Sequence, residues 1–241
     1  MLITRFAGVV AALALLLATG PAVTSSAAGL NHAASCPTAA YGPLFYAPGA
    51  PKTVALTFDD GPGRSTAAIL AVLVRYRVPA TFFNIGVNMV TRPWLVRDEA
   101  KGGYVLGDHT WDHPDMAIIS AAWQATELDR TAAEQRRLTG TVPCVFRPPY
   151  GAYDAITLWL AQQRRMTVWM WSVDTQDWMA RGSGSAYWVN RIIWLAESEG
   201  GALRHPVVLM HNQATGNPAT VTALPTIISF FRSHGYRFVA L

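Results

Sequence analysis

Residues 53–62 read TVALTFDDGP, a stretch that combines a strand pattern with two adjacent acidic side chains. Its first six residues are apolar or β-branched and predict a buried strand, which Gly61 and Pro62 then end in a turn. Asp59 and Asp60 therefore stand together at the strand end, where like charges repel unless a cation neutralises one of them. A divalent metal ion on one carboxylate would leave the other free to transfer a proton. The alternative is a loop or helix cap, because Asp-Asp-Gly is also common in turns.

Strand and helix patterns alternate from residue 51 to the end of the chain. The strand patterns lie at residues 53–58, 80–84, 104–106, 144–147, 167–173, 207–210 and 236–240. The helix patterns lie between them, at residues 66–76, 94–101, 121–138, 155–165, 186–199 and 221–233. This alternation predicts an α/β barrel of about seven parallel strands, covered by helices, in a single domain. An open doubly wound sheet is the alternative, and the lack of a glycine-rich fingerprint after the first strand disfavours a dinucleotide-binding fold.

Composition limits the classes of function. The chain has 241 residues, of which 51% are hydrophobic and 14% charged, as in a globular domain with a sizeable core. Its net charge of +4 comes from 19 basic and 15 acidic residues. The basic residues are scattered rather than clustered on one element, so we expect no nucleic-acid partner.

The N-terminal segment predicts export. Arg5 precedes an apolar run at residues 7–20, and small residues follow up to a cleavage point after Ala28, as in a secretory signal peptide. The run is shorter than the roughly 20 residues of a spanning helix, so we expect no stable membrane insertion after cleavage; an uncleaved anchor is the alternative. We predict a signal peptide at residues 1–28, a linker or irregular arm at 29–50 and the domain at 51–241. The protein would be secreted and extracellular, where it could associate with a cell wall.

The chain has two cysteines, Cys36 in the predicted arm and Cys144 in the predicted domain. Export permits a disulfide, which would tie the arm to the domain. Two free thiols are the alternative, because one sequence does not fix the distance between the two residues.

Polar and reactive side chains follow five of the seven predicted strands. Because the carboxyl ends of parallel strands meet at one edge of a sheet, we expect these groups to form one site. The segments are Asp59-Asp60, DHTWDHP at residues 108–114, RPPYG at 147–151, DTQDW at 174–178, and His211.

His109 and His113 lie four residues apart in the second of these segments. Two imidazoles with this spacing can reach one cation from a single turn, and a third ligand leaves coordination positions open for water. With Asp60 the set becomes two imidazoles and a carboxylate, which predicts zinc, with cobalt or another divalent ion as the alternative. Such a pair of histidines also occurs by coincidence on protein surfaces.

The remaining groups have structural alternatives. Arg147, in a rigid Pro-Pro-Tyr-Gly setting, would hold a carboxylate in place or form an ordinary ion pair. Asp177 and Trp178 would serve the site or close a loop, and His211 would be catalytic or a satisfied core histidine. Their joint position at the predicted strand ends favours the functional interpretation.

Taken together, these motifs resemble a known family. In chain order they are Thr-Phe-Asp-Asp-Gly, His-Thr-x-x-His-Pro, Arg-Pro-Pro-Tyr-Gly, Asp-x-x-Asp-Trp and Val-Leu-Met-His. The set is similar to that of the NodB-type polysaccharide deacetylases, carbohydrate esterase family 4, and the resemblance covers residues 51–241. It implies a distorted (β/α) barrel that removes acetyl groups from chitin, chitooligosaccharides, peptidoglycan or acetylated xylan.

The resemblance also implies a role for each matched residue. The implied metal ligands are Asp60, His109 and His113. Asp59 would be the general base, aligned by Arg147. His211 would be the general acid that protonates the leaving amine, oriented by Asp177.

Three further positions complete the implied site. The backbone N–H of Tyr150 would stabilise the oxyanion, and Trp178 and Leu209 would line the pocket for the acetyl methyl group. Two positions depart from the common family pattern: Asp108 replaces a frequent Asn, and Asn212 replaces a frequent Asp. We expect Asp108 to accept a hydrogen bond from an imidazole N–H.

The resulting expectation is a secreted, metal-dependent hydrolase that releases acetate from a polysaccharide or oligosaccharide. A glycan containing N-acetylglucosamine, such as peptidoglycan or chitin, is favoured over acetylated xylan, and N- versus O-deacetylation stays open. The alternatives are a hydrolase of another small amide on the same scaffold and a catalytically silent glycan-binding protein. The substrate, the metal and the oligomeric state do not follow from the sequence.

Overall fold

The computed structural model describes Leu2, Cys36, Pro37 and residues 39–241. Apart from Leu2, the described residues belong to one compact unit. The predicted signal peptide lies outside the described residues except at Leu2, so it stays a prediction. Among the helices that are described, none has both the length and the apolar character needed to cross a membrane.

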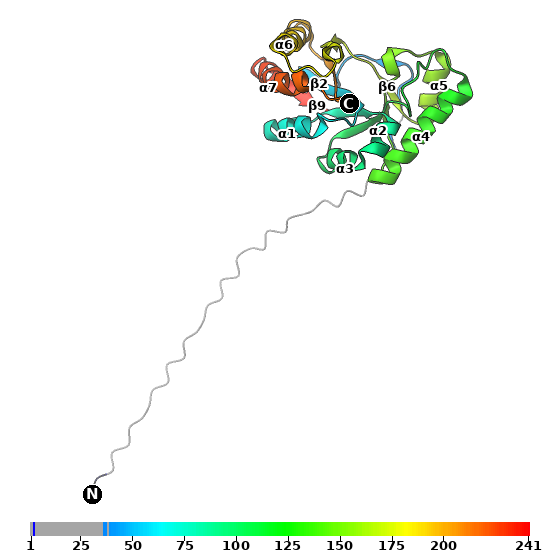
Figure 1. Ribbon diagram of the computed structural model, residues 1–241, viewed down its shortest axis with the longest axis horizontal. Helices are drawn as coiled ribbons and strands as arrows, with labels where there is room; N and C mark the ends of the chain where they lie inside the picture. The colour runs from blue at the N-terminus through cyan, green and yellow to red at the C-terminus, as the bar shows by residue number, and fades with distance from the viewer. Residues whose placement is uncertain (1, 3–35, 38) are drawn as a thin grey trace. The chain divides into compact units, whose positions relative to one another are not determined.

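One curled sheet of nine parallel strands forms the centre of the described chain (Figure 1). The strands are β1 (Pro43–Leu44), β2 (Thr53–Gly61), β3 (Thr81–Asn84), β4 (Val105–Asp108), β5 (Val145–Phe146), β6 (Thr167–Trp169), β7 (Val173–Asp174), β8 (Val207–His211) and β9 (Arg237–Val239). Their order is β1-β6-β5-β4-β3-β2-β8-β7, and β9 pairs with β2. The predicted α/β fold with a parallel, barrel-like sheet is therefore confirmed.

β2 is the central strand because it pairs with three others. Thr53 at its start lies opposite Arg237 of β9. Asp59 near its end lies opposite Phe83 of β3 and His211 of β8. Every residue from Thr53 to Asp59 is buried, as expected of a parallel strand that is covered on both faces.

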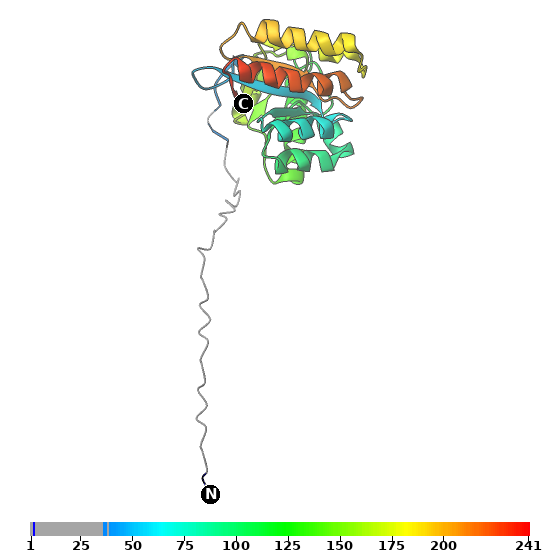
Figure 2. The same ribbon diagram turned by 90° about the vertical axis from the view of Figure 1, so that its left-hand side faces the viewer.

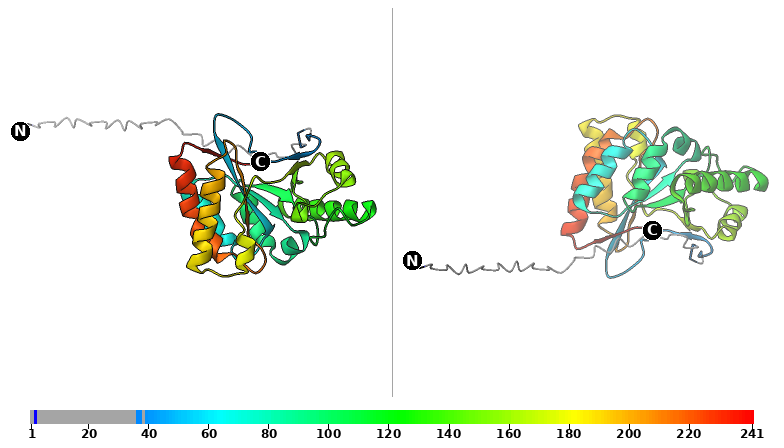
Figure 3. Two further views of the ribbon diagram at one scale, coloured as in Figure 1. Left: turned by 90° about the horizontal axis from the view of Figure 1, so that it is seen from above. Right: turned by 90° about the horizontal axis from the view of Figure 1, so that it is seen from below.

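Helices cover the outside of the sheet (Figure 3). Those described are α1 (Thr66–Tyr76), α2 (Gly86–Thr91), α3 (Pro93–Lys101), α4 (Ala121–Thr139), α5 (Ala155–Gln163), α6 (Ala186–Gly200) and α7 (Pro218–Ser233), with the 3-10 helices η1 (Pro149–Gly151) and η2 (Asp177–Ala180). α6 and α7 run side by side (Figure 2), and α4 and α5 lie on the opposite side of the sheet (Figure 1).

The two faces of β2 carry different side chains. Leu56 and Phe58 belong to the large apolar cluster that includes residues of α1, α6 and α7, whereas Ala55 belongs to a smaller cluster. Because side chains alternate along a strand, Thr57 and Asp59 share the face of Ala55. The apolar outer face thus anchors the strand, and the inner face presents polar groups.

The prediction of one strand at residues 167–173 is wrong, because this stretch forms β6 and β7 with a break between them. Here the chain changes neighbours: β6 pairs with β5 and β1, whereas β7 pairs with β8. At the break, Arg147 donates from Nε to the Trp169 carbonyl at 2.9 Å and from Nη2 to the Met170 carbonyl at 2.8 Å. The Arg147 side chain thus donates to two carbonyl groups that lie where the strand is interrupted.

The predicted irregular arm at residues 29–50 is partly ordered into the sheet. Pro43 and Leu44 form β1 against β6, and the Ala47 N–H donates to the His205 carbonyl at 2.8 Å. The expectation of an irregular segment is therefore wrong at β1. A two-residue strand is too short to leave a hydrophobic period in the sequence.

Cys36 and Cys144 form a disulfide. Cys36 belongs to the N-terminal arm, and Cys144 directly precedes β5. The bond decides between the two alternatives left open by the sequence. It also closes a loop with a sequence separation of 108 residues.

We expect replacement of both cysteines by alanine to lower the free energy of unfolding by about 2–4 kcal/mol, because the bond restricts a long loop in the unfolded chain. Urea unfolding followed by circular dichroism measures the change, with oxidised and reduced wild-type protein as references. An unchanged urea midpoint in the double variant would contradict a stabilising bond.

Candidate active site

Both carboxylates of the Asp-Asp pair face the site because β2 is irregular at its end. The register of β2 against β3 shifts between Asp59 and Gly61, and Asp60 has a positive φ of 66°. In a regular strand Asp60 would point to the face opposite Asp59, and the bulge turns it back. Gly61 lies between the amide groups of Asn84 and Asn212, where an added Cβ would approach both within 2.5 Å.

Asp60, His109 and His113 converge, with one potential ligand atom from each residue and all three atoms within 4.8 Å of one another. Asp60 Oδ1 lies 3.3 Å from His109 Nε2 and 3.1 Å from His113 Nε2. His109 Nδ1 donates to the Arg147 carbonyl at 2.6 Å, which turns the lone pair of Nε2 toward Asp60. Acceptor atoms that face one another in this way fit a cation between them.

The Asp60 carboxyl group has the character of a metal ligand. Burial raises its pKa, but the imidazoles of His109 and His113 lower it well below its ordinary value. Its Oδ1 atom is buried and accepts no hydrogen bond. Two imidazoles and one carboxylate are a typical ligand set of a catalytic zinc site with open positions.

The two histidines come from a loop rather than from a turn of helix. Thr110 and His113 have positive φ values of 66° and 69°, which fold residues 109–113 back on themselves. The Thr110 hydroxyl accepts a hydrogen bond from the His113 N–H at 3.1 Å. The i, i+4 spacing thus brings the rings together through a local turn of unusual backbone conformation.

Asp59 is held by a buried guanidinium. Arg147 Nη1 donates to Asp59 Oδ1 and to the Thr57 hydroxyl, both at 2.8 Å, and Arg147 is completely buried. The second carboxylate oxygen, Asp59 Oδ2, lies 3.9 Å from His109 Nε2. One oxygen of Asp59 is therefore fixed by the protein, and the other faces the metal-ligand cluster.

His211 is the second titratable group of the site. Its Nδ1 atom donates to Asp177 Oδ1 at 2.6 Å, and its backbone N–H donates to Asp177 Oδ2 at 2.8 Å. The Thr220 hydroxyl of α7 donates to the same Oδ2 at 2.6 Å. Burial lowers the pKa of His211, but the carboxylates of Asp177, above all, and of Asp60 and Asp59 outweigh it and raise the pKa to about 9.

The remaining predicted residues lie around this centre. Tyr150 belongs to η1, has a φ of 59°, and places its ring edge-on to His113 at 4.6 Å between centroids. Trp178 on η2 is half-exposed, and Leu209 on β8 is buried opposite Thr57. These positions are compatible with an oxyanion donor and a small apolar pocket, and the roles themselves stay predictions.

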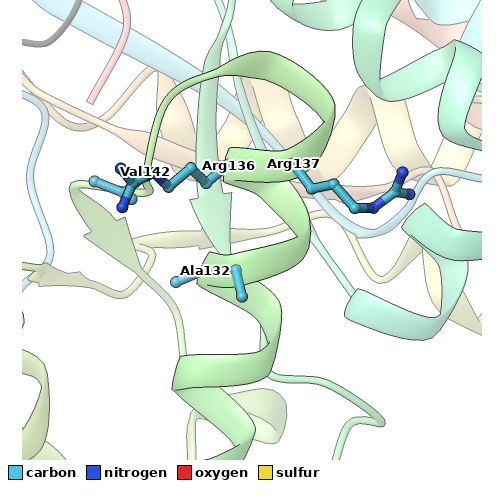
Figure 4. A pocket seen from close by; sticks show the side chains of 5 residues that line it. Ala132, Arg136, Arg137 and Val142 are labelled. Carbon is cyan, nitrogen blue, oxygen red and sulfur yellow. The ribbon is translucent and has the colours of Figure 1, made fainter.

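A shallow hollow elsewhere on the surface does not contribute to the site. It is lined by Ala132, Ala133, Arg136, Arg137 and Val142. None of these residues belongs to the Asp–His cluster, and Arg136 and Arg137 point in opposite directions (Figure 4). The charged groups there do not converge on a common point.

A comparison with protein families matches residues 47–169 to the polysaccharide deacetylase family. The chain belongs to this family. A peptidoglycan-N-acetylglucosamine deacetylase of Bacillus cereus is 34% identical over 203 residues, which cover 83% of this chain and 71% of that protein. The peptidoglycan-N-acetylglucosamine deacetylase PgdA of Listeria monocytogenes is 35% identical over 191 residues, which cover 79% of this chain. This chain matches only 38% of the length of PgdA.

Solved structures agree with this assignment. The Bc1960 peptidoglycan N-acetylglucosamine deacetylase, in complex with 4-naphthalen-1-yl-N-oxidanyl-benzamide, superposes with a TM-score of 0.76 and 34% identity. The match covers 83% of this chain and 91% of that chain. A CE4 family pseudoenzyme from Bacillus anthracis superposes with a TM-score of 0.75 at 24% identity, which shows a shared fold.

One expectation about this deacetylase-family chain is wrong. Asp108 accepts a hydrogen bond from the Thr110 N–H at 2.7 Å, and not from an imidazole. The His109 ring bonds to the Arg147 carbonyl instead. Burial raises the pKa of the Asp108 carboxyl group well above its ordinary value. Asp108 therefore shapes the turn after β4 rather than orienting a ring.

Two contacts of the site were not anticipated from the sequence. Thr57 accepts from Arg147, and Thr220 donates to Asp177. Thr57 lies inside the Thr-Phe-Asp-Asp-Gly motif, so the motif offered a signal for it. Thr220 lies 43 residues after Asp177 on α7, and nothing in its sequence context indicates the contact.

We expect His109→Ala and His113→Ala each to abolish stoichiometric zinc binding, because either change removes one of three ligands. Elemental analysis after dialysis against zinc measures the metal content. His234→Ala is the control, since His234 is exposed and its ring bonds to Phe230 and Ser233 at the end of α7, not to the site. Full zinc content in both ligand variants would contradict the site.

Proposed function

We propose that this chain is a secreted, metal-dependent deacetylase that hydrolyses the N-acetyl amide of a glycan containing N-acetylglucosamine. The observation that carries the proposal is the pairing of Asp59 and His211. They occupy partner positions on β2 and β8, and each is held by its own buried partner, Arg147 or Asp177. Such a pair supplies a base and an acid on adjacent strands.

A divalent cation held by Asp60, His109 and His113 would polarise the acetyl carbonyl group and lower the pKa of a nearby water. Asp59 accepts the proton of the attacking water through its free oxygen. Arg147 keeps the carboxylate in place and prevents it from turning away. The new carbon–oxygen bond forms as this proton is transferred.

His211 completes the reaction by protonating the leaving nitrogen. An amine departs only when protonated, so breaking the carbon–nitrogen bond requires an acid. Asp177 fixes the ring through Nδ1, which leaves Nε2 to donate the proton. The Tyr150 N–H would donate a hydrogen bond to the negative oxygen that develops during the attack. The products are acetate and a free amino group on the sugar.

The names of relatives support the substrate class. The matched proteins include peptidoglycan-N-acetylglucosamine deacetylases and the chitin deacetylase of Amylomyces rouxii, which is 32% identical over 186 residues. All these names refer to glycans that contain N-acetylglucosamine, which favours this class over acetylated xylan. The presence of both Asp59 and His211 favours catalysis over a silent glycan-binding role.

Secretion is part of the proposal. It is supported by the signal-peptide pattern at residues 1–28 and by the Cys36–Cys144 disulfide. Disulfides form and persist mainly in oxidising compartments outside the cytosol. A peptidoglycan substrate would place the protein at the cell wall.

We expect the purified protein to release acetate from N-acetylglucosamine oligomers or peptidoglycan, with loss of activity in chelator and recovery in zinc. Acetylated xylan tests the alternative substrate in the same assay. Asp59→Asn should retain zinc and lose about 10²–10⁴-fold in rate, as expected for loss of a general base. A fully active Asp59→Asn protein would contradict the role of Asp59, and the absence of acetate from every glycan would contradict the proposed reaction.

We expect the rate to fall as the pH rises through about 9, because His211 donates a proton and its pKa is raised to about 9. Asp177→Asn removes the carboxylate that raises this pKa, so the fall should begin at lower pH. Turnover measured at saturating substrate from about pH 6 to pH 10 gives both profiles. If the pH profiles of wild type and Asp177→Asn superimpose, the contact of Asp177 with His211 does not cause the fall in rate at high pH.

A further inference from the structure

The loop that carries the two histidines is held from both sides by backbone hydrogen bonds. On one side, α2 donates to it: the Gly86 N–H bonds the Thr110 carbonyl at 3.0 Å, and the Val87 N–H bonds the Trp111 carbonyl at 2.9 Å. On the other side, the loop itself donates to α4. The two helices are in contact with each other (Figure 1).

The acceptor on α4 is a single carboxylate, Glu127. Its Oε2 atom accepts from the Trp111 N–H at 2.8 Å and from the Asp112 N–H at 3.0 Å. Its Oε1 atom accepts from the Trp123 indole N–H at 3.1 Å. Both backbone donors belong to residues that lie between His109 and His113 in the chain.

Glu127 is buried, with only 1% of its surface exposed. Within the described residues Glu127 forms no ion pair. The cost of burying its carboxylate is therefore offset by the three N–H groups that donate to it. Charge-assisted bonds of this kind are stronger than neutral ones. A buried acid is costly, and the loop is the main source of its partners.

The loop of residues 109–113 needs these hydrogen bonds because part of its backbone is in an unfavourable conformation. Thr110 and His113 have positive φ values, which are unfavourable for residues with a side chain. Without an external acceptor, the Trp111 and Asp112 N–H groups would favour other loop conformations. In those conformations the two imidazoles would not both face Asp60.

We infer that Glu127 is a positioning residue that holds the loop of residues 109–113 in the ligand geometry before a metal ion binds. It would act through the backbone of Trp111 and Asp112 and would not touch the metal or the substrate. The inference rests on the proposed metal site at Asp60, His109 and His113. It predicts that metal affinity depends on a side chain outside the ligand set.

The test compares zinc affinity among variants of α4. We expect Glu127→Ala to raise the zinc dissociation constant about 10–100-fold, as for other residues that orient metal ligands. Trp123→Phe removes only the indole donor and should change the constant little. Glu134→Ala removes a second buried acid of the same helix, one that pairs with Arg137 and not with the loop, and should leave the constant unchanged. Competition with a chromophoric chelator gives the constants.

A second readout does not use metal. In zinc-free protein, we expect the Trp111 and Asp112 amides to exchange hydrogen faster in Glu127→Ala than in wild type, with amides of β2 unchanged. Circular dichroism and the free energy of unfolding, measured alongside, separate this local effect from general destabilisation.

If Glu127→Ala does not fold, Glu127→Gln replaces it. Its single carbonyl oxygen can still accept from the loop, but its NH₂ group then faces the Trp123 indole N–H. We therefore expect weakened zinc binding in Glu127→Gln and partial recovery when Trp123→Phe is added.

The outcomes are distinguishable. A folded Glu127→Ala protein with wild-type zinc affinity and wild-type amide exchange would overturn the inference and leave the metal site intact. Wild-type protein that binds no zinc would instead contradict the proposed metal site. In that case amide exchange alone decides whether Glu127 holds the loop.

Discussion

The buried guanidinium of Arg147 is the interaction on which both the sheet and the site depend. A cation without solvent must be surrounded by acceptors. Arg147 finds them in Asp59, in the Thr57 hydroxyl and in the carbonyl groups of Trp169 and Met170. The same side chain therefore fills the break between β6 and β7 and fixes the proposed base. Its own carbonyl group accepts a hydrogen bond from His109, so the backbone of Arg147 also orients one of the three proposed metal ligands.

The site combines two kinds of support. Asp59 and His211 lie on paired strands in the interior of the sheet, where the hydrogen-bond ladder fixes their positions. His109 and His113, the proposed metal ligands, lie on a loop whose conformation depends on side-chain and helix contacts. Strand residues are positioned by the fold itself, whereas the loop needs N–H donors from α2 and an acceptor from α4.

Much of the architecture followed from local patterns. The helix predicted at residues 66–76 is α1 with the same bounds, and each predicted strand overlaps at least one observed strand. β1 was missed and β6 and β7 were merged, since strands of two or three residues have no measurable period. The convergence of Asp60, His109 and His113 could be predicted because these residues lie at or near the carboxyl ends of β2 and β4.

The rest of the site could not be predicted, for a physical reason. Glu127 and Thr220 act across 15 or more residues, Glu127 on backbone groups and Thr220 on a distant side chain. Such contacts require no motif and leave no periodicity. The prediction for Asp108 failed for a different, local reason: the N–H of Thr110, two residues further along the chain, donates to Asp108 in place of the expected imidazole.

The strand register places Asp59 opposite His211, which makes the spacing of these two residues independent of the loops around the rim. Neighbouring strands lie about 4.7–4.9 Å apart, so the ladder sets the spacing between the backbone positions of the proposed base and the proposed acid. Loops around the rim can change in length or composition without altering that spacing. The proposed cleavage would thus depend on the strand ladder, while the choice of glycan would depend on the loops at its edge.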